Sequence, residues 1–244
     1  MEKELAQAAR LLRASSKTVA LTGAGVSTES GIPDFRGKNG LWSRFDPLEY
    51  GTLGAFRRDP EKVWRMLAEL IVFADCQANP GHQALARLEE IGLLAGVITQ
   101  NIDGLHQKAG SQQVVEFHGS LFSFTCPRCG DRQPLARVRR MTLPPHCLAC
   151  AEIVKPDVIF FDEAIPPRVL LETERLLAGV DLLLVAGTSC EVAPASLIPD
   201  QVLGRGGQVI EINLSPVLGR QATVTLTGGF SATMAELLDW VKRQ

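Results

Sequence analysis

The stretch "KTVALTGAGVS", residues 17–27, decides the fold of this chain. Its first half is a run of β-branched and small apolar residues, which predicts a short buried strand. The strand leads into Gly23-Ala24-Gly25 and Ser27, a turn whose backbone can come close to a pyrophosphate. The turn is not a full G-x-G-x-x-G, and no acidic residue ends the next apolar run, "VITQN". This absence argues against a dehydrogenase that transfers hydride to a dinucleotide.

Similar apolar runs of strand length recur along the chain: "AGVITQ", "QVVEFHG", "VDLLLVAGTS", "GQVIEINLS" and "ATVTLTG". Helical periodicity lies between several of them, at residues 81–92, 168–179 and 233–244, and residues 1–16 form a charged amphipathic helix pattern. Near-continuously apolar strands that alternate with helices predict an α/β fold, a parallel sheet with helices on both faces.

Two segments interrupt this alternation. Residues 38–81 are a mixed stretch with scattered aromatic residues and a helical pattern, and residues 120–156 hold two pairs of cysteines and show little periodicity. We interpret both segments as insertions into one α/β core, which then comprises residues 1–37, 82–119 and 157–244.

Charge and composition exclude several classes of protein. The 244 residues are 45% hydrophobic and carry a formal net charge of −2, so nucleic acid and anionic membrane are not expected as partners. No apolar run reaches the roughly 18 residues of a membrane span. The charged N-terminal helix is not a signal peptide. We therefore expect a cytoplasmic protein.

The cysteine pairs predict a metal site. Cys126-x-x-Cys129 and Cys147-x-x-Cys150 are separated by 17 residues, a spacing typical of a tetrahedral zinc bound by four thiolates. A complete set of four protein ligands leaves no open position, so this single zinc ion would be structural, and folding of the insertion would depend on it. Unmetallated thiols are the alternative, and His146 is interpreted as a spare residue.

Polar and glycine residues stand where the apolar runs end. Because the carboxyl ends of parallel strands share one edge, where ligands bind, we expect these residues to form one site. His118 suits a general base, since the ordinary histidine pKa of about 6.5 lets a neutral imidazole take a proton; a hydrogen-bonded core histidine is the alternative. The other residues at these ends are Gln100, Asn101, Asp103, Gly187, Thr188, Ser189, Asn213 and Ser215.

In their order along the chain, these motifs resemble the sirtuins, the NAD-dependent protein-lysine deacylases. The resemblance covers nearly the whole chain: "GAGVSTESGIPDFRG", "TQNID", "FHG", the two cysteine pairs, "KPDVIFFDEAIP", "GTS" and "INLSP". It implies a large Rossmann-like NAD-binding domain and a small domain, which the helical insertion and the zinc-ribbon insertion would form together.

The resemblance also implies residue roles. His118 would be the general base, Asn101 would order water and ribose, and Asp103 with the Ile102 backbone would hold the nicotinamide carboxamide. We accordingly expect NAD, rather than the protein core, to partner Asn101 and Asp103. The full set implied to contact NAD is Gly23, Ala24, Gly25, Ser27, Phe35, Arg36, Gln100, Asn101, Ile102, Asp103, Gly187, Thr188, Ser189, Asn213 and Ser215.

The implied reaction transfers the acyl group of a modified lysine to ADP-ribose and releases nicotinamide and O-acetyl-ADP-ribose. The acyl oxygen of the substrate attacks the ribose carbon, so no serine or cysteine nucleophile is needed. Acyl-lysine segments of other proteins would bind by strand addition between residues 158–163 and 191–195. The residues implied to contact them are Val158, Phe161, Asp162, Glu163 and Val192.

Two departures from the family pattern concern this peptide. Asp162 stands where glycine is usual, and Ala193 where an aromatic residue or asparagine is usual. The Asp162 carboxylate would either disfavour acidic peptides or point outward into solvent.

A further comparison concerns the acyl group. Sirtuins that remove succinyl or malonyl groups carry a Tyr-x-x-Arg pair in the helical insertion, where this chain has Leu67 and Leu70. An apolar lining would leave a dicarboxylic acyl group unpaired, so we expect acetyl or longer apolar chains.

Two other functions remain open at this stage. A mono-ADP-ribosyltransferase would release nicotinamide without an acyl-lysine peptide. A zinc-ribbon module that binds nucleic acid is disfavoured, because such a module would not need "GIPDFRG" or "QNID".

Overall fold

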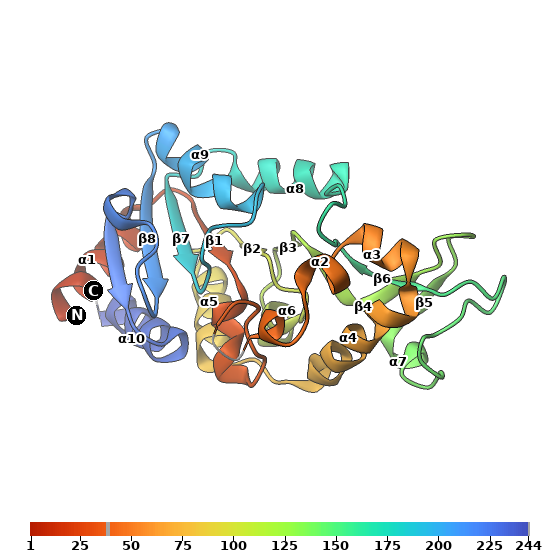
Figure 1. Cartoon of the computed structure of the whole chain (residues 1–244). Coiled ribbons are helices and arrows are strands. Elements are labelled where there is room, and N and C mark those ends of the chain that lie inside the picture. The colour runs from red at the N-terminus through yellow and green to blue at the C-terminus, as the bar shows by residue number, and fades with distance from the viewer. Residues whose placement is uncertain (38–39, 244) are drawn as a thin grey trace.

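The computed structural model describes residues 1–37 and 40–243 (Figure 1). The first two residues of the predicted helical insertion therefore lie outside the described residues. The helices are α1 (Glu2–Ala14), α2 (Pro47–Tyr50), α3 (Leu53–Arg58), α4 (Pro60–Val72), α5 (Pro80–Glu90), α6 (Leu105–Ala109), α7 (Leu135–Val138), α8 (Pro167–Leu177), α9 (Ile198–Gly204) and α10 (Phe230–Arg243). The strands are β1 (Thr18–Thr22), β2 (Val97–Thr99), β3 (Val114–Glu116), β4 (Gly119–Thr125), β5 (Arg132–Pro134), β6 (Lys155–Val158), β7 (Leu182–Ala186), β8 (Gln208–Asn213) and β9 (Val224–Thr227).

The main sheet has six parallel strands in the order β3-β2-β1-β7-β8-β9. The chain runs from β1 outward to β2 and β3 and returns on the other side of β1 to β7. The neighbouring strands β1 and β7 therefore form a topological switch point, where open α/β sheets bind ligands at the carboxyl ends of their strands. In register, Thr22 at the end of β1 lies between Thr99 and Ala186.

Helices cover both faces of this sheet, as predicted (Figure 1). Alternate residues of β1 and β7 point to opposite faces: Ala20 and Leu184 pack with α1, α5 and α10, whereas Leu21 and Val185 pack with α8 and α9. All five residues of β1 are buried, which accounts for its continuously apolar sequence.

The predicted strands and long helices are found in the structure, but α7, α9 and the three strands of the small sheet were not predicted. Capping residues place some helix ends. Asn79 accepts hydrogen bonds from the backbone N–H groups of Gly81 and His82, and Pro80 occupies the first turn of α5. Among the helices of the described chain, none is long and apolar enough to cross a membrane.

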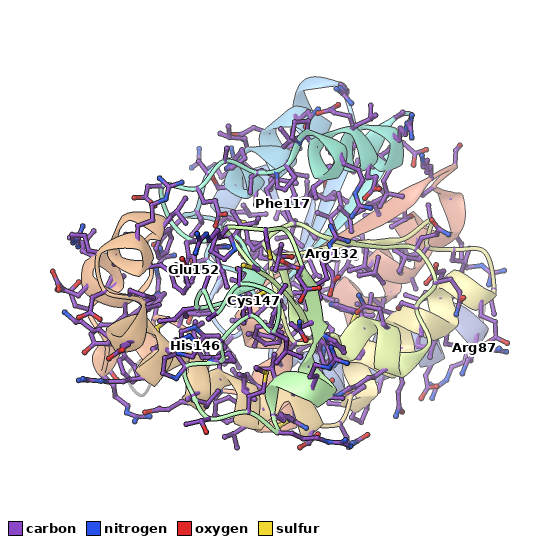
Figure 2. All side chains as sticks on the ribbon, turned by 90° about the vertical axis from the view of Figure 1, so that its right-hand side faces the viewer. Arg87, Phe117, Arg132, His146, Cys147 and Glu152 are labelled. Carbon is purple, nitrogen blue, oxygen red and sulfur yellow. The ribbon has the colours of Figure 1, made fainter. Side chains whose placement is uncertain are left out.

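A second, smaller sheet has the antiparallel order β5-β4-β6 and lies with α2, α3, α4 and α7 at the other end of the molecule (Figures 1 and 2). The two insertions share a core here. The Trp64 ring of α4 stacks on Phe124 of β4, with ring centres 5.9 Å apart, and its Nε1–H donates to the Val154 carbonyl at 3.0 Å. The Rossmann-like sheet with a small domain is therefore confirmed, while the limits 38–81 and 120–156 stay a prediction.

Candidate active site

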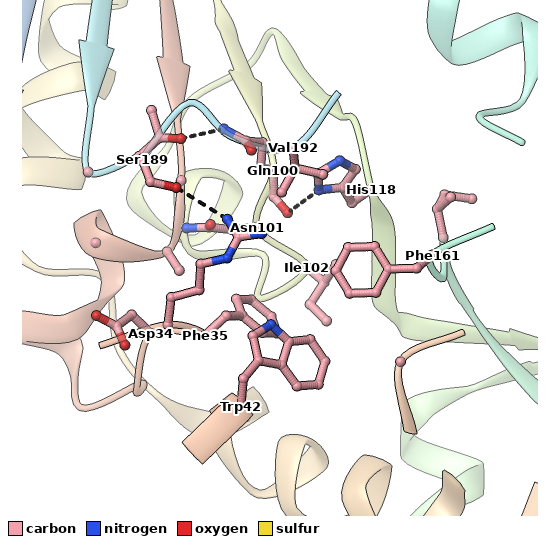
Figure 3. Close-up of a pocket in the computed structure, with 18 of the residues that line it drawn as sticks. Asp34, Phe35, Trp42, Gln100, Asn101, Ile102, His118, Phe161, Ser189 and Val192 are labelled. Carbon is pink, nitrogen blue, oxygen red and sulfur yellow. Dashed lines mark hydrogen bonds between the residues drawn. The ribbon is translucent and has the colours of Figure 1, made fainter. Parts of the chain in front are cut away.

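A cavity of about 490 Å³ lies along the carboxyl ends of the parallel strands, between the sheet and the small domain. Figure 3 shows its lining, with Phe35 and Trp42 on one side and Gln100, His118 and Ser189 on the other. Of the residues predicted to contact NAD or peptide, these line it: Gly23, Ala24, Gly25, Phe35, Arg36, Gln100, Asn101, Ile102, His118, Val158, Phe161, Asp162, Glu163, Gly187, Thr188, Ser189, Val192, Asn213 and Ser215. The sequence motifs thus converge on one site.

The glycines after β1 and β7 let these two turns pack against each other. The Gly25 N–H donates to the Gly187 carbonyl at 2.8 Å. A Cβ added to Gly23 would lie 2.7 Å from the Thr188 Cβ, and one on Gly25 would lie 2.8 Å from the Gly187 Cα. Gly187 itself has a φ of 57°. The glycines therefore bring two backbone turns together at the switch point, in addition to leaving open backbone beside the cavity.

Asn101 and Asp103 are partnered inside the protein. The Ser27 hydroxyl donates to Asp103 Oδ2 at 2.7 Å, and Asn101 Nδ2 donates to the Ser27 Oγ at 3.1 Å. Asp103 Oδ1 also accepts from the Leu105 N–H at 2.9 Å. The expectation that only NAD would partner these side chains is wrong, because the strand-end polar groups already form a network with the turn after β1.

Ser27 and Asp103 line a second, smaller cavity of about 30 Å³ rather than the large one. Ala24, Phe35, Asn101 and Ile102 line both cavities. The residues predicted to hold nicotinamide and ribose therefore lie together, with Asp103 in the smaller cavity and Asn101 where the two cavities meet.

His118 follows β3 and has one ring nitrogen committed to the backbone. Its Nδ1 lies 3.2 Å from the Gln100 carbonyl oxygen, which can only accept, so Nδ1 carries the proton and Nε2 keeps a lone pair. Burial lowers the pKa of His118, although the bond to the Gln100 carbonyl raises it. The imidazole is thus neutral near pH 7 and able to accept a proton at Nε2.

The side chain of Gln100 holds its own backbone, and with it the carbonyl that bonds His118, against the loop after β7. Its Nε2 donates to the Thr188 hydroxyl at 2.9 Å, so the loop after β2 is bonded to the loop after β7 (Figure 3). The same side chain therefore links the carbonyl that orients His118 to the "GTS" turn.

At the far end of the cavity, Asn213 joins β8 to the "GTS" turn. Its Oδ1 accepts from the Thr188 N–H at 3.2 Å, and its Nδ2 donates to the fully buried Glu211 at 2.9 Å. Glu211 also accepts from the Val217 N–H at 2.6 Å, which holds the loop that carries Ser215 beside the cavity.

Arg36 spans the cavity from the turn after Pro33. Its Nη1 lies 3.3 Å from the Ser189 hydroxyl and 3.0 Å from Glu191 Oε2. Both members of the ion pair are largely exposed. The Phe35 and Trp42 rings pack in a tilted arrangement with centres 5.4 Å apart, and the Trp42 and Phe161 ring centres are 5.9 Å apart. A row of aromatic rings thus connects this loop to residues 158–163, the peptide segment, which is predicted to bind the acyl-lysine peptide.

One end of the cavity is apolar. Leu67 and Leu70, one turn apart on α4, both line it, as does Met66. Trp64 packs in the small-domain core, and Phe73 lines the smaller cavity. Among the described residues that line the large cavity, Arg36 is the sole arginine or lysine.

The structure is consistent with the interpretation that the Asp162 side chain is exposed to solvent. The residue also lines the cavity, and its carboxylate accepts hydrogen bonds from the N–H groups of Leu53 at 2.7 Å and Gly54 at 3.3 Å. The neighbouring Glu163 pairs with Lys155 at 3.0 Å and accepts from the Phe160 N–H at 3.0 Å. The carboxylates of Asp162 and Glu163 therefore help to hold the backbone conformation of residues 158–163.

The four cysteines form a cluster that fits zinc. All four sulfur atoms lie within 4.8 Å of one another, and the Cys126–Cys150 and Cys129–Cys147 pairs are 3.5 Å apart. Four sulfurs around one zinc at about 2.3 Å would be separated by about 3.8 Å. Donor type, number and spacing therefore suit one structural ion.

The backbone repeats the same turn at both cysteine pairs. The Gly130 N–H donates to the Cys126 carbonyl and the Ala151 N–H to the Cys147 carbonyl, each at 2.9 Å, and both donors have positive φ. His146 Nδ1 lies 2.8 Å from the Ala151 carbonyl, so its interpretation as a spare residue is consistent with the structure (Figure 2).

Some lining residues were not predicted, notably Trp42, Gly51, Leu214 and Phe230. The aromatic residues of the helical insertion offered a signal for Trp42. Gly51 offered none, because its place beside Trp42 and Phe161 depends on a tertiary contact.

Comparisons with known proteins agree with this arrangement. The model of the Sir2 family matches residues 23–194. An NAD-dependent protein deacylase of Pyrobaculum aerophilum is 42% identical, covering 97% of this chain and 95% of its own length. One from Thermus thermophilus is 41% identical, covering 97% and 94%.

Solved structures give the same result. A structure described for the mechanism and regulation of Sir2 enzymes is 36% identical, with a TM-score of 0.93 and coverage of 100% of this chain and 99% of that one. A Sir2 homologue in complex with NAD is 42% identical, with a TM-score of 0.90 and coverage of 100% and 94%. A Sir2 variant with a deacetylated p53 peptide and 3'-O-acetyl ADP-ribose is 33% identical, with a TM-score of 0.90 and coverage of 96% of each. The chain belongs to the Sir2 family, the sirtuins.

Proposed function

We propose that this protein is an NAD-dependent protein-lysine deacylase, most simply a deacetylase, that transfers the acyl group to ADP-ribose and releases nicotinamide. The observation that carries the proposal is His118, a neutral histidine with Nδ1 fixed and Nε2 free, in the cavity at the switch point of the sheet. The relatives named as NAD-dependent deacylases support it.

NAD fits the lining as substrate. The turns at Gly23–Gly25 and Gly187–Ser189 offer backbone beside the cavity for the phosphates, and Asn213 and Ser215 lie at the end proposed for the adenosine ribose. Arg36 can exchange Glu191 for a phosphate oxygen, because an exposed ion pair contributes only about 0–1 kcal/mol.

At the reacting end, Asn101 and Asp103 are proposed to hold ribose, water and the nicotinamide amide, with Ser27 and the Leu105 N–H fixing their orientation. Phe35 covers the junction of the two cavities. His118 Nε2 is proposed to take the proton of a ribose hydroxyl. The substrate's acyl oxygen supplies the nucleophile.

The second substrate is proposed to be an acyl-lysine segment of another protein, seated between residues 158–163 and Val192. The relative solved with a deacetylated peptide supports this class of partner. The zinc ion would hold the two cysteine turns together and take no part in the reaction. A cytoplasmic location remains a prediction.

The test is nicotinamide release with an acetyl-lysine peptide and NAD, followed by mass spectrometry of the peptide. Release should require the peptide, and His118→Ala should lower it by about 10²–10⁴-fold, as loss of a general base does. His146→Ala, with its zinc content verified, is the matched control and should retain activity. Nicotinamide release without peptide, with ADP-ribose attached to protein, would instead establish an ADP-ribosyltransferase.

A further inference from the structure

Asp162 occupies a backbone position that suits glycine. Its φ is 60°, in the left-handed region where an ordinary side chain is strained. Aspartate tolerates this region better than most residues because its short side chain can form local hydrogen bonds. The aspartate must therefore supply an interaction that glycine would lack.

That interaction is a tether to the helical insertion. The Asp162 carboxylate accepts from the N–H groups of Leu53 and Gly54, at 2.7 and 3.3 Å. Main-chain bonds run beside it: the Phe161 N–H donates to the Gly51 carbonyl at 2.9 Å, and the Leu53 N–H to the Phe161 carbonyl at 3.0 Å. The peptide segment is thus joined to residues 51–54, although the two are about a hundred residues apart in sequence.

The contact also depends on the absence of a side chain at Gly54. A Cβ there would lie 3.2 Å from Asp162 Oδ2, tighter than an ordinary contact. Thr52 caps the next N–H of the same turn, that of Ala55, at 2.9 Å. The free N–H groups in the first turn of α3 are therefore bonded by the Thr52 hydroxyl and by the Asp162 carboxylate together.

The tether acts on the walls of the cavity. Phe161, next to Asp162, lies 5.9 Å from Trp42, and a Cβ on Gly51 would lie 3.0 Å from Trp42 and 3.2 Å from Phe161. All three residues line the cavity, and Trp42 packs against the apolar cluster that contains Leu67 and Leu70. The residues proposed to surround the acyl-lysine therefore come from both of the segments that the tether joins.

We propose that Asp162 is a positioning residue: its carboxylate, added to the main-chain bonds of Phe161, holds residues 161–162 against residues 51–54 and so fixes the acyl-lysine end of the cavity. The proposal rests on the proposed function. It implies that Asp162 governs the binding of the acylated peptide and leaves NAD binding unchanged, since the turns at Gly25 and Gly187 are bonded to each other independently of the tether.

Three variants separate this role from general stability. Asp162→Gly accepts the backbone conformation but loses the tether, so the KM for acetyl-lysine peptide should rise about tenfold, as expected for charge-assisted bonds, while the KM for NAD stays within about twofold. Asp162→Asn keeps one acceptor oxygen and should stay within about threefold of the parent. Asp239→Asn, an exposed position on α10, controls for the loss of one negative charge.

The measurement is steady-state kinetics with acetyl-, butyryl- and octanoyl-lysine peptides at saturating NAD, and with varied NAD at saturating peptide. An unchanged peptide KM in Asp162→Gly, or an equal rise in both KM values, overturns the inference while the deacylase function stands. If the parent protein deacylates none of the peptides, the proposed function fails.

Trypsin cleavage of the native protein after the exposed Arg57 and Arg58 still tests the tether in that case. Cleavage should be faster in Asp162→Gly than in Asp162→Asn or the parent. Equal cleavage rates in all three proteins would overturn the tether itself.

Discussion

Succinyl-lysine is the substrate that tests the apolar end of the cavity most directly. Leu67 and Leu70 are 1% and 9% exposed and present only methyl groups to the cavity. Arg36, which is proposed to bind an NAD phosphate, is the sole arginine or lysine among its described lining residues. A succinyl carboxylate would be buried there without a partner, at a cost of at least about 3 kcal/mol. Since 1.4 kcal/mol is tenfold, kcat/KM for succinyl-lysine should be at least about 10²-fold below that for butyryl-lysine.

The converse change should create the missing partner. In Leu67→Tyr/Leu70→Arg, a guanidinium about 4 Å from the carboxylate would contribute about 4 kcal/mol at an effective dielectric constant of about 20. Overpacking by the larger side chains would offset about 1–3 kcal/mol of this. We expect desuccinylation to rise about tenfold or more relative to debutyrylation. Leu67→Phe/Leu70→Met, which adds volume without charge, should show no such rise.

The assay is mass spectrometry of succinyl- and butyryl-lysine peptides of one sequence, incubated with NAD and each protein, with thermal unfolding to confirm that the variants are folded. The ratio of desuccinylation to debutyrylation in the parent protein tests the argument by itself, without the variants. Desuccinylation within tenfold of debutyrylation would show that the cavity supplies a cation or water to the carboxylate, and the argument from Leu67 and Leu70 would be wrong.

Two further predictions concern stability. Removing zinc with a chelator should release one ion per chain and lower the free energy of unfolding by several kcal/mol, because the ion would hold the two cysteine turns together; an unchanged unfolding temperature after metal loss, measured by calorimetry, would contradict this. Burial lowers the pKa of His106 from 6.5 to about 3 and that of His82 from 6.5 to about 4. Both are then neutral in the folded protein and charged in the unfolded chain at acid pH, so the free energy of unfolding should fall as pH drops below 6.5, by about 2 kcal/mol per histidine at pH 5. Urea unfolding of the parent and of His106→Gln at pH 8 and pH 5 checks this, and equal pH dependence in the two would contradict it.

The parallel α/β class of the fold and the convergence of the motifs could be predicted because they depend on local patterns. Apolar runs that end in polar residues mark the carboxyl edge of a parallel sheet, so Gln100, His118 and Thr188 could be placed on one edge without coordinates. The cysteine spacing is equally local, because each turn is built within six residues of the chain.

The roles of particular side chains could not be predicted in the same way. The sequence left open whether the Asp162 carboxylate acts on the peptide's charge or points into solvent. It did not indicate that this exposed carboxylate binds the backbone of Leu53 and Gly54, which lie about a hundred residues earlier. His106 lies in α6, and its Nε2 is 2.9 Å from the Thr22 hydroxyl at the end of β1. Such contacts follow from tertiary packing and leave no periodic signal.

The polar groups of the site fall into two kinds that differ in how strongly they are held. Asn101 and Asp103 are buried and bonded to Ser27, so moving either would leave a buried polar group unpaired, at about 1–3 kcal/mol each. Arg36 and Glu191 are exposed, and their pairing can be exchanged at little cost. The reacting end is therefore preorganised by the protein alone, while the cation that spans the cavity can change partner. The phosphates of NAD could therefore replace Glu191 as the partner of Arg36, while Asn101 and Asp103 keep their positions.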